Sequence, residues 1–247
     1  MRLAPQLYLV GSGEVGLSDP DDCHVYLLDG GDEYAIIDAG CGTEQSVAAI
    51  AATIAREGLD PARLTTILLT HWHFDHAGGA SRFREEFGCR IIAPAGERAF
   101  IEAGRDGVAP VSVDLAVDDG DTVRVGALTL TAHCVPGHSE ATTAYRVDLP
   151  WGRVLFAGDI VFINGILGLL NYPGSDLANY RRYLERLAGL GVDALLPSHL
   201  LFTIGNGQRH IDRAIEQLRE GFVPYSIGQT AVSFIPSRQF GGSGPPR

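Results

Sequence analysis

Short apolar runs, either unbroken or with every second residue apolar, recur along the chain and predict β-strands. They fall into two strand-rich halves. The first half comprises Leu7-Val10, Val25-Leu28, Ala35-Asp38, Thr66-Thr70 and Arg90-Ala93. The second half comprises Val123-Val125, Leu128-Ala132, Thr143-Val147, Arg153-Ala157 and Ala194-Leu196.

Longer segments with apolar residues three and four positions apart alternate with these strands and predict amphipathic helices. Gly58 and Pro61 end the first of them. The expected helices are one from Glu44 to Arg56, one capped by Ser175 or Asp176, and a last one with the apolar stripe Ile211, Ile215 and Leu218. The pattern therefore predicts an α/β protein in which helices flank two groups of strands.

At 247 residues the chain is long enough for one large domain with a substantial core. We expect a single domain over residues 1–236. Residues 237–247 contain Gly-Gly-Ser-Gly-Pro-Pro, which cannot build regular structure, and are predicted to be a Gly/Pro-rich tail.

Membrane and secretion signals are absent from the pattern. No apolar run is long enough to span a bilayer, and the segment Met1 to Val10 contains Pro5 and lacks the apolar centre of a signal peptide. We therefore expect a cytoplasmic protein. The four cysteines show no paired spacing such as C-x-x-C, so they are interpreted as reduced, mostly buried thiols.

The formal net charge is −11, and all nineteen basic residues are arginine. Without lysine, a lysine Schiff base or lysine nucleophile is excluded. The acidic balance disfavours nucleic acid as a partner. Arg181-Arg182 is the one adjacent basic pair, and we interpret it as a solvated helix face.

The most informative motif, His71-Trp72-His73-Phe74-Asp75-His76, follows the apolar run Ile67-Leu68-Leu69-Thr70. In extended backbone, residues two apart point the same way, so His71 and His73 can bind one cation. Asp75 and His76 then face elsewhere and are placed for a second ion. The motif thus predicts the beginnings of two adjacent metal sites.

Three further donors each end an apolar run next to Gly or Pro, which is where open α/β sheets place their chemistry. They are His138 in Val135-Pro136-Gly137-His138-Ser139, Asp159 in Leu155-Phe156-Ala157-Gly158-Asp159, and His199 in Leu195-Leu196-Pro197-Ser198-His199. Together with the motif, they favour ligation over a purely structural role.

With these residues, the chain resembles the metallo-β-lactamase-fold hydrolases. The signature of that family is His-x-His-x-Asp-His followed by a later His, an Asp and a final His. Ile36-Ile37-Asp38-Ala39-Gly40 is similar to the strand-end Asp that buttresses the metal loop in that family. The resemblance runs over nearly the whole chain and implies a four-layered αββα sandwich. One departure is Ser198, where the family often has Gly.

Carried over residue by residue, the resemblance implies two divalent metal ions, zinc by preference, with iron or manganese as alternatives. The first ion would be held by His71, His73 and His138, the second by Asp75, His76 and His199, and Asp159 would bridge both. The implied activity is hydrolysis of an ester, thioester or lactone by a metal-bridging hydroxide, with Asp75 also orienting the nucleophile. The expected partner is a small acyl substrate, and a homodimer is left open.

Two other functions stay open. One is a mononuclear iron persulfide dioxygenase of the same fold, which would use His71 or His73 with His138 and Asp159. The other is a non-catalytic metal-binding module, disfavoured because structural sites are closed and Cys-rich. Within the family, hydroxyacylglutathione hydrolases carry a basic helical C-terminal region, whereas only 48 lysine-free residues follow His199 here. Lactonases are nearer in size, and true β-lactamases commonly lack the bridging Asp.

The segment Phe162 to Tyr172 follows Asp159 and is largely apolar, so we expect it to line a pocket for an acyl group. Tyr172 is the predicted oxyanion donor, with Asn164 and Asn171 as alternatives. The remaining histidines are expected to be structural or to orient ligands in the case of His24 and His133, and to lie on the surface in the case of His210.

Overall fold

A computed structural model describes residues 1–227 of the chain. The predicted boundary between a domain ending at 236 and a tail at 237–247 lies outside these described residues. Across 1–227, no helix combines the length and the apolar composition that crossing a membrane requires.

The strands form two sheets. The first has seven strands in sequence order, antiparallel from β1 to β4 and parallel from β4 to β7. They are β1 (Arg2–Ala4), β2 (Leu7–Gly11), β3 (Val25–Asp29), β4 (Tyr34–Ile37), β5 (Leu64–Leu68), β6 (Arg90–Pro94) and β7 (Leu115–Val117). The four parallel strands therefore all end at the same edge of this sheet.

The second sheet has five strands in the order β12-β11-β10-β9-β8. Its strands are β8 (Thr122–Val125), β9 (Leu128–Cys134), β10 (Thr143–Leu149), β11 (Gly152–Gly158) and β12 (Ala194–Pro197). All neighbours are antiparallel except β11 and β12, which run parallel with Leu155 opposite Leu195.

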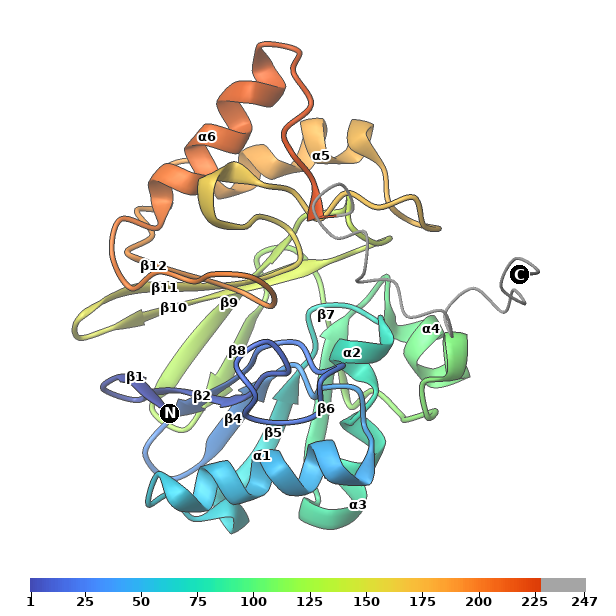
Figure 1. Cartoon of the computed structure of the whole chain (residues 1–247), viewed down its shortest axis with the longest axis vertical. Coiled ribbons are helices and arrows are strands. Elements are labelled where there is room, and N and C mark those ends of the chain that lie inside the picture. The colour runs from blue at the N-terminus through green and yellow to red at the C-terminus, as the bar shows by residue number, and fades with distance from the viewer. Residues whose placement is uncertain (228–247) are drawn as a thin grey trace, which may run out of the picture.

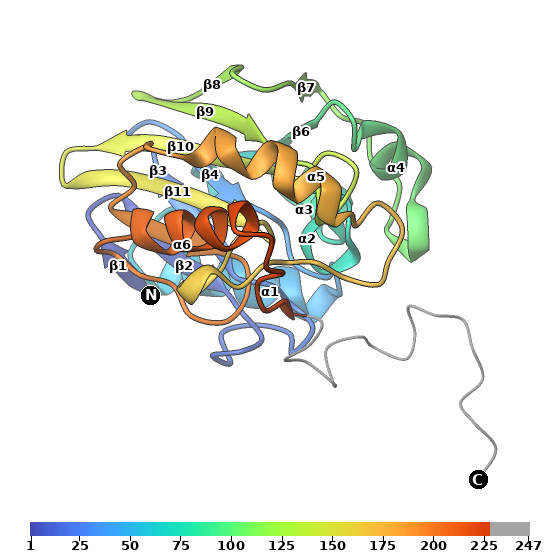
Figure 2. The same cartoon turned by 90° about the horizontal axis from the view of Figure 1, so that it is seen from above.

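Helices cover the outer face of each sheet. Figure 1 shows α1 and α3 below the first sheet and α5 and α6 above the second, and Figure 2 shows the latter two lying across their sheet. The helices are α1 (Glu44–Arg56), α2 (Phe74–Ala77), α3 (Ala80–Phe87), α4 (Arg98–Ala103), α5 (Leu177–Tyr183) and α6 (Gln208–Arg219). Short 3-10 helices lie at Pro61–Arg63, Arg105–Gly107, Ile163–Gly165 and Leu184–Leu187.

The period-two pattern explains the layering, because successive residues of a strand pack into different cores. In β3, Val25 and Leu27 pack against α1 and α3, whereas Tyr26 and Leu28 pack between the two sheets. A third core, containing Leu155 and residues of α5 and α6, lies on the far side of the second sheet. Three cores between four layers confirm the predicted αββα sandwich.

All ten predicted strands are present, with ends shifted by a few residues. The helix at Glu44–Arg56 has the predicted bounds, and Asp176 rather than Ser175 caps α5, its carboxylate accepting from Ala178 N. The two unpredicted strands, β1 and β7, are three-residue edge strands. Such short segments become strands only through pairing with a neighbour, which a local pattern cannot show.

Two smaller predictions are also confirmed. The four cysteines form no disulfide; Cys23 and Cys89 are buried, and the other two are half-buried. Arg181 and Arg182 lie on the exposed face of α5.

Candidate metal centre

Seven side chains able to bind a metal lie together where strand ends of both sheets meet. They are His71 and His73 after β5, Asp75 and His76 on α2, His138 after β9, Asp159 after β11 and His199 after β12. Parallel neighbours end at the same edge of a sheet, so β11 and β12 deliver their donors side by side. The fold thus brings together every predicted ligand.

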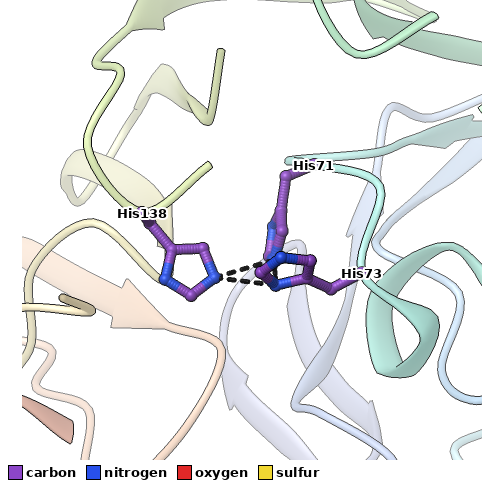
Figure 3. A group of neighbouring side chains, drawn as sticks. All are labelled: His71, His73 and His138. Atoms are coloured by element: carbon purple, nitrogen blue, oxygen red, sulfur yellow. Dashed lines mark hydrogen bonds between the residues drawn. The ribbon is translucent and has the colours of Figure 1, made fainter. Parts of the chain in front are cut away.

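His71, His73 and His138 form the first group of donors, and Figure 3 shows their rings converging. His71 Nε2 lies 2.9 Å from His73 Nδ1, and His138 Nε2 lies 3.1 and 3.0 Å from these two atoms. Burial is the main cause that lowers the pKa of all three imidazoles, so they are neutral, the form that binds a metal. Three neutral nitrogens this close suit one shared cation with bonds of about 2.0–2.1 Å.

Asp75, His76 and His199 form the second group. The Nε2 atoms of His76 and His199 lie 3.5 and 3.1 Å from Asp75 Oδ2. Asp159 lies between the two groups, because its Oδ2 is 3.5 Å from His138 Nε2 and 3.7 and 3.6 Å from the Nε2 atoms of His76 and His199. A carboxylate in this position can reach two cations at once.

The carboxylates of the second group and Asp159 make this part of the site attractive to positive charge. Burial opposes ionisation of Asp75, but the facing His76 and His199 lower the pKa of its carboxyl to about 2. Burial by itself would lower the pKa of His199, but the carboxylates of Asp159 and Asp75 raise it to about 10. Buried carboxylates need compensating positive charge, which a divalent cation supplies.

Three donor atoms of this cluster are buried and have no hydrogen-bond partner among the residues that the structure describes. They are His73 Nε2, His76 Nε2 and Asp159 Oδ1. Leaving a polar group buried and unpaired costs about 1–3 kcal/mol. His76 Nε2, which faces Asp75 and Asp159, and the mixed nitrogen and oxygen donor set therefore fit divalent cations, whereas His73 faces the first group through Nδ1.

Asp38 ties the cluster to the fold. Its buried carboxylate accepts hydrogen bonds from Thr70 N at 2.8 Å and Ser198 Oγ at 3.1 Å, and it lies 2.8 Å from His76 Nδ1. One side chain after β4 therefore fixes the loops after β5 and β12 together. In the first donor group, His138 Nδ1 donates to Gly168 O at 2.5 Å, and this bond orients the His138 ring.

Comparison with known proteins gives this geometry a family. Residues 18–199 match the family model described as the metallo-beta-lactamase superfamily. The chain belongs to the metallo-β-lactamase superfamily.

Curated relatives in this superfamily include hydroxyacylglutathione hydrolases. That of Rhodopseudomonas palustris strain BisA53 is 39% identical over 137 residues, covering 53% of this chain and 48% of the relative. That of Pseudomonas putida strain KT2440 is 41% identical over 102 residues, covering 41% of this chain and 35% of the relative. The chain thus spans about half the length of the curated relatives it matches.

Solved structures of the superfamily share the whole fold. A motif mutant of the metallo-β-lactamase from Cronobacter sakazakii matches with a TM-score of 0.71 at 24% identity, covering 90% of this chain and 95% of that one. A subclass B3 metallo-β-lactamase of Bradyrhizobium japonicum matches with a TM-score of 0.71 at 25% identity, covering 90% of this chain and 91% of that one. At 24% identity, the match to the Cronobacter sakazakii enzyme shows a similar fold and nothing more.

The departure at Ser198 has a structural role in this member of the superfamily. Its hydroxyl donates to Asp38, and its backbone N–H donates to Gly158 O at 3.0 Å. Ser198 therefore adds a contact that glycine could not make between the strand-end Asp and the loop carrying His199.

Three sequence-based expectations are wrong. Asp75 and His76 lie on α2 rather than in extended backbone, so helical geometry aims them at the second group. His210 is buried, not on the surface, and its Nδ1 accepts a hydrogen bond from Asn164 N at 3.0 Å. Leu167 belongs to the core beneath α5 and α6 rather than to a pocket wall.

Tyr172 lies beside the first group. Its ring packs edge-on against His73, with centroids 5.2 Å apart, and stacks on Trp72 at 5.7 Å. Its hydroxyl donates to Asp106, and burial together with this carboxylate raises the pKa of the phenol. The role of Tyr172 as an oxyanion donor stays a prediction. Asn164 and Asn171, the alternatives, are exposed.

Glu97 is a buried carboxyl that the sequence analysis missed, because a lone Glu after Gly96 is typical of a surface loop. Its Oε1 accepts from Ser139 Oγ at 2.7 Å and from Ala141 N at 2.6 Å, so it braces the loop that carries His138. Burial raises the pKa of this carboxyl from its ordinary value of 4.5 to about 7 in spite of these bonds.

This shift predicts a pH-dependent stability. Between pH 4.5 and about 7 the folded state keeps a proton on Glu97 that the unfolded state releases, so the free energy of unfolding falls as pH rises. At 1.36 kcal/mol per unit, the loss is about 3 kcal/mol. The buried histidines titrate in both proteins, so in urea unfolding at pH 4.5 and 8 the wild type should lose about 3 kcal/mol more than Glu97→Gln. Parallel changes in both proteins would contradict the assignment.

Proposed function

We propose that the chain is a binuclear metal-dependent hydrolase that cleaves a small acyl ester, thioester or lactone. The observation that supports it is the position of Asp159, whose carboxylate lies 3.5 to 3.7 Å from histidines of both donor groups. Asp159 would contribute a ligand to each of two cations, one held by the first group and one by the second. The mixed N and O donors favour zinc, with iron or manganese as alternatives.

Bound divalent cations would supply an acidified water as the nucleophile and would polarise the substrate carbonyl. The chain's own residues hold and orient these parts. Asp75 is the more exposed of the two carboxylates, with 17% of its side chain accessible against 7% for Asp159. It is therefore the group placed to orient the attacking water at the open side of the site.

The names of the relatives bear on the substrate. The curated relatives are hydroxyacylglutathione hydrolases, which supports the thioester within the proposed class. The match covers about half of this chain, so lactones and simple esters stay in the class. The expected cytoplasmic location and the homodimer stay predictions.

The persulfide dioxygenase alternative is disfavoured by the second donor group. A two-His-one-carboxylate iron site would be complete with His71 or His73, His138 and Asp159, leaving Asp75, His76 and His199 unused. Yet His199 Nε2 lies 3.1 Å from Asp75 Oδ2, and both face Asp159. A mononuclear site gives no reason for this arrangement.

Substitution of the bridging residue tests the proposal. Asp159→Ala removes the carboxylate shared by both cations, so kcat/KM should fall by several orders of magnitude together with the metal content. The measurements are metal analysis and hydrolysis of a panel of esters, thioesters and lactones. The wild type should hold close to two zinc ions per chain.

His133→Ala is the matched control, because His133 is a half-buried histidine on β9 that belongs to neither donor group. It should keep the metal and most of the activity. Equal losses in the two variants would show that the ligand set is wrong. One iron per chain, with oxygen uptake on a persulfide, would establish the dioxygenase instead.

A second substitution tests Tyr172. If its hydroxyl exchanges Asp106 for the substrate oxyanion, Tyr172→Phe should lower kcat about 10²- to 10³-fold, the usual effect of losing one such donor. Metal content and KM should change little, because the ring remains packed on Trp72. A fall of less than about threefold would remove Tyr172 from the catalytic residues.

A further inference from the structure

Leu200, directly after the predicted ligand His199, has a strained backbone. Its φ is +62°, in the left-handed region that costs a non-glycine residue about 1–2 kcal/mol. Both of its backbone polar groups are held. Its N–H donates to the two carboxylate oxygens of Glu14 at 3.0 and 2.8 Å, and its carbonyl lies 2.8 Å from His24 Nε2. The strain is thus maintained by two side chains from a distant part of the chain.

A compact loop presents Glu14. Ser12 N donates to Ser18 Oγ at 2.8 Å, and Leu17 N donates to Ser12 O at 2.9 Å, which closes the loop. Gly13 is required there, because a Cβ would lie 2.2 Å from Pro20 O. The same Ser12 lies against His24, with Oγ 2.9 Å from Nδ1.

The tautomer of His24 follows from these contacts. A carbonyl can only accept, so Nε2 carries the hydrogen that is donated to Leu200 O. Nδ1 then accepts from the hydroxyl of Ser12. One nitrogen of this buried ring therefore holds the Leu200 carbonyl, and the other fixes the ring against Ser12.

Glu14 also faces the ligand itself. His199 directs Nε2 towards Asp75, at 3.1 Å, and Nδ1 towards Glu14 Oε1, at 3.6 Å. A carboxylate beside the far nitrogen of a ligating histidine fixes the orientation of the ring and increases the basicity of the nitrogen that binds the metal.

We propose that Glu14 and His24 are positioning residues for the second cation: they hold the strained Leu200 peptide and thereby aim the His199 imidazole at Asp75 and Asp159. This inference rests on the proposed binuclear centre. Its prediction concerns the affinity for the second ion, which can be measured apart from hydrolysis.

The test is titration of the metal-free full chain with Zn²⁺ in competition with a chromophoric chelator. Glu14→Gln keeps an oxygen that can accept from Leu200 N–H but loses the charge facing His199. We expect the affinity for the second zinc ion to fall about 10- to 100-fold, the usual effect of losing such a partner. The affinity for the first ion, held by the three-histidine group, should change less than about threefold. Glu14→Ala, which also releases Leu200, should lose more.

Glu33→Gln is the matched control. Glu33 also accepts from a backbone N–H and a hydroxyl, those of Gly126 at 2.6 Å and Thr65 at 2.8 Å, but it precedes β4 at the end opposite to Asp38. It should leave both zinc affinities unchanged. Unfolding curves in urea for all variants separate lost binding from lost folding.

The outcomes are distinct. An unchanged second affinity in Glu14→Gln, or an equal loss in Glu33→Gln, would overturn the inference, as would a wild type that binds fewer than two ions. A wild type that binds two ions but hydrolyses nothing in the substrate panel would refute the proposed function while the selective loss in Glu14→Gln still supported the positioning role.

Discussion

The burial of six metal-binding side chains at one edge of the sandwich, with a seventh, Asp75, partly buried beside them, is the constraint on which the rest of the structure depends. A polar group out of water and without a partner costs free energy, and an unpaired charge costs far more. Asp38 provides part of the compensation, since it joins the ends of β4, β5 and β12 through Thr70, His76 and Ser198. Of the buried atoms left without a hydrogen-bond partner among the described residues, His76 Nε2 faces Asp75 and Asp159 in the second donor group.

The sandwich supplies these donors because both sheets contain parallel strands that end at the same edge. Asp38 and His71 follow the parallel pair β4 and β5, and Asp159 and His199 follow the parallel pair β11 and β12. Helices on the outer faces let apolar residues from both faces of the strands pack into the adjoining cores. The loops after the strands are then free to differ in sequence, and they carry the chemistry.

Much of this could be predicted from the sequence, since period-two strands and a six-residue cluster of donors are local patterns. The six-residue motif predicts four of the seven converging side chains, the ends of apolar runs predict the other three, and the family resemblance implies their grouping. The failures have a common cause in tertiary contacts. α2 has only four residues, His210 is buried and accepts from the distant Asn164 N, and Glu14 and Glu97 bind partners far away along the chain. An isolated Glu in a polar loop has no local mark of burial.

The central claim is that two cations occupy the two donor groups and share Asp159. Anomalous diffraction at the zinc edge from crystals grown with Zn²⁺ tests it most directly. The account predicts two peaks, roughly 3.5–4 Å apart as in other two-metal sites, one among His71, His73 and His138 and one among Asp75, His76 and His199. A single peak confined to the first group, or peaks away from Asp159, would contradict it.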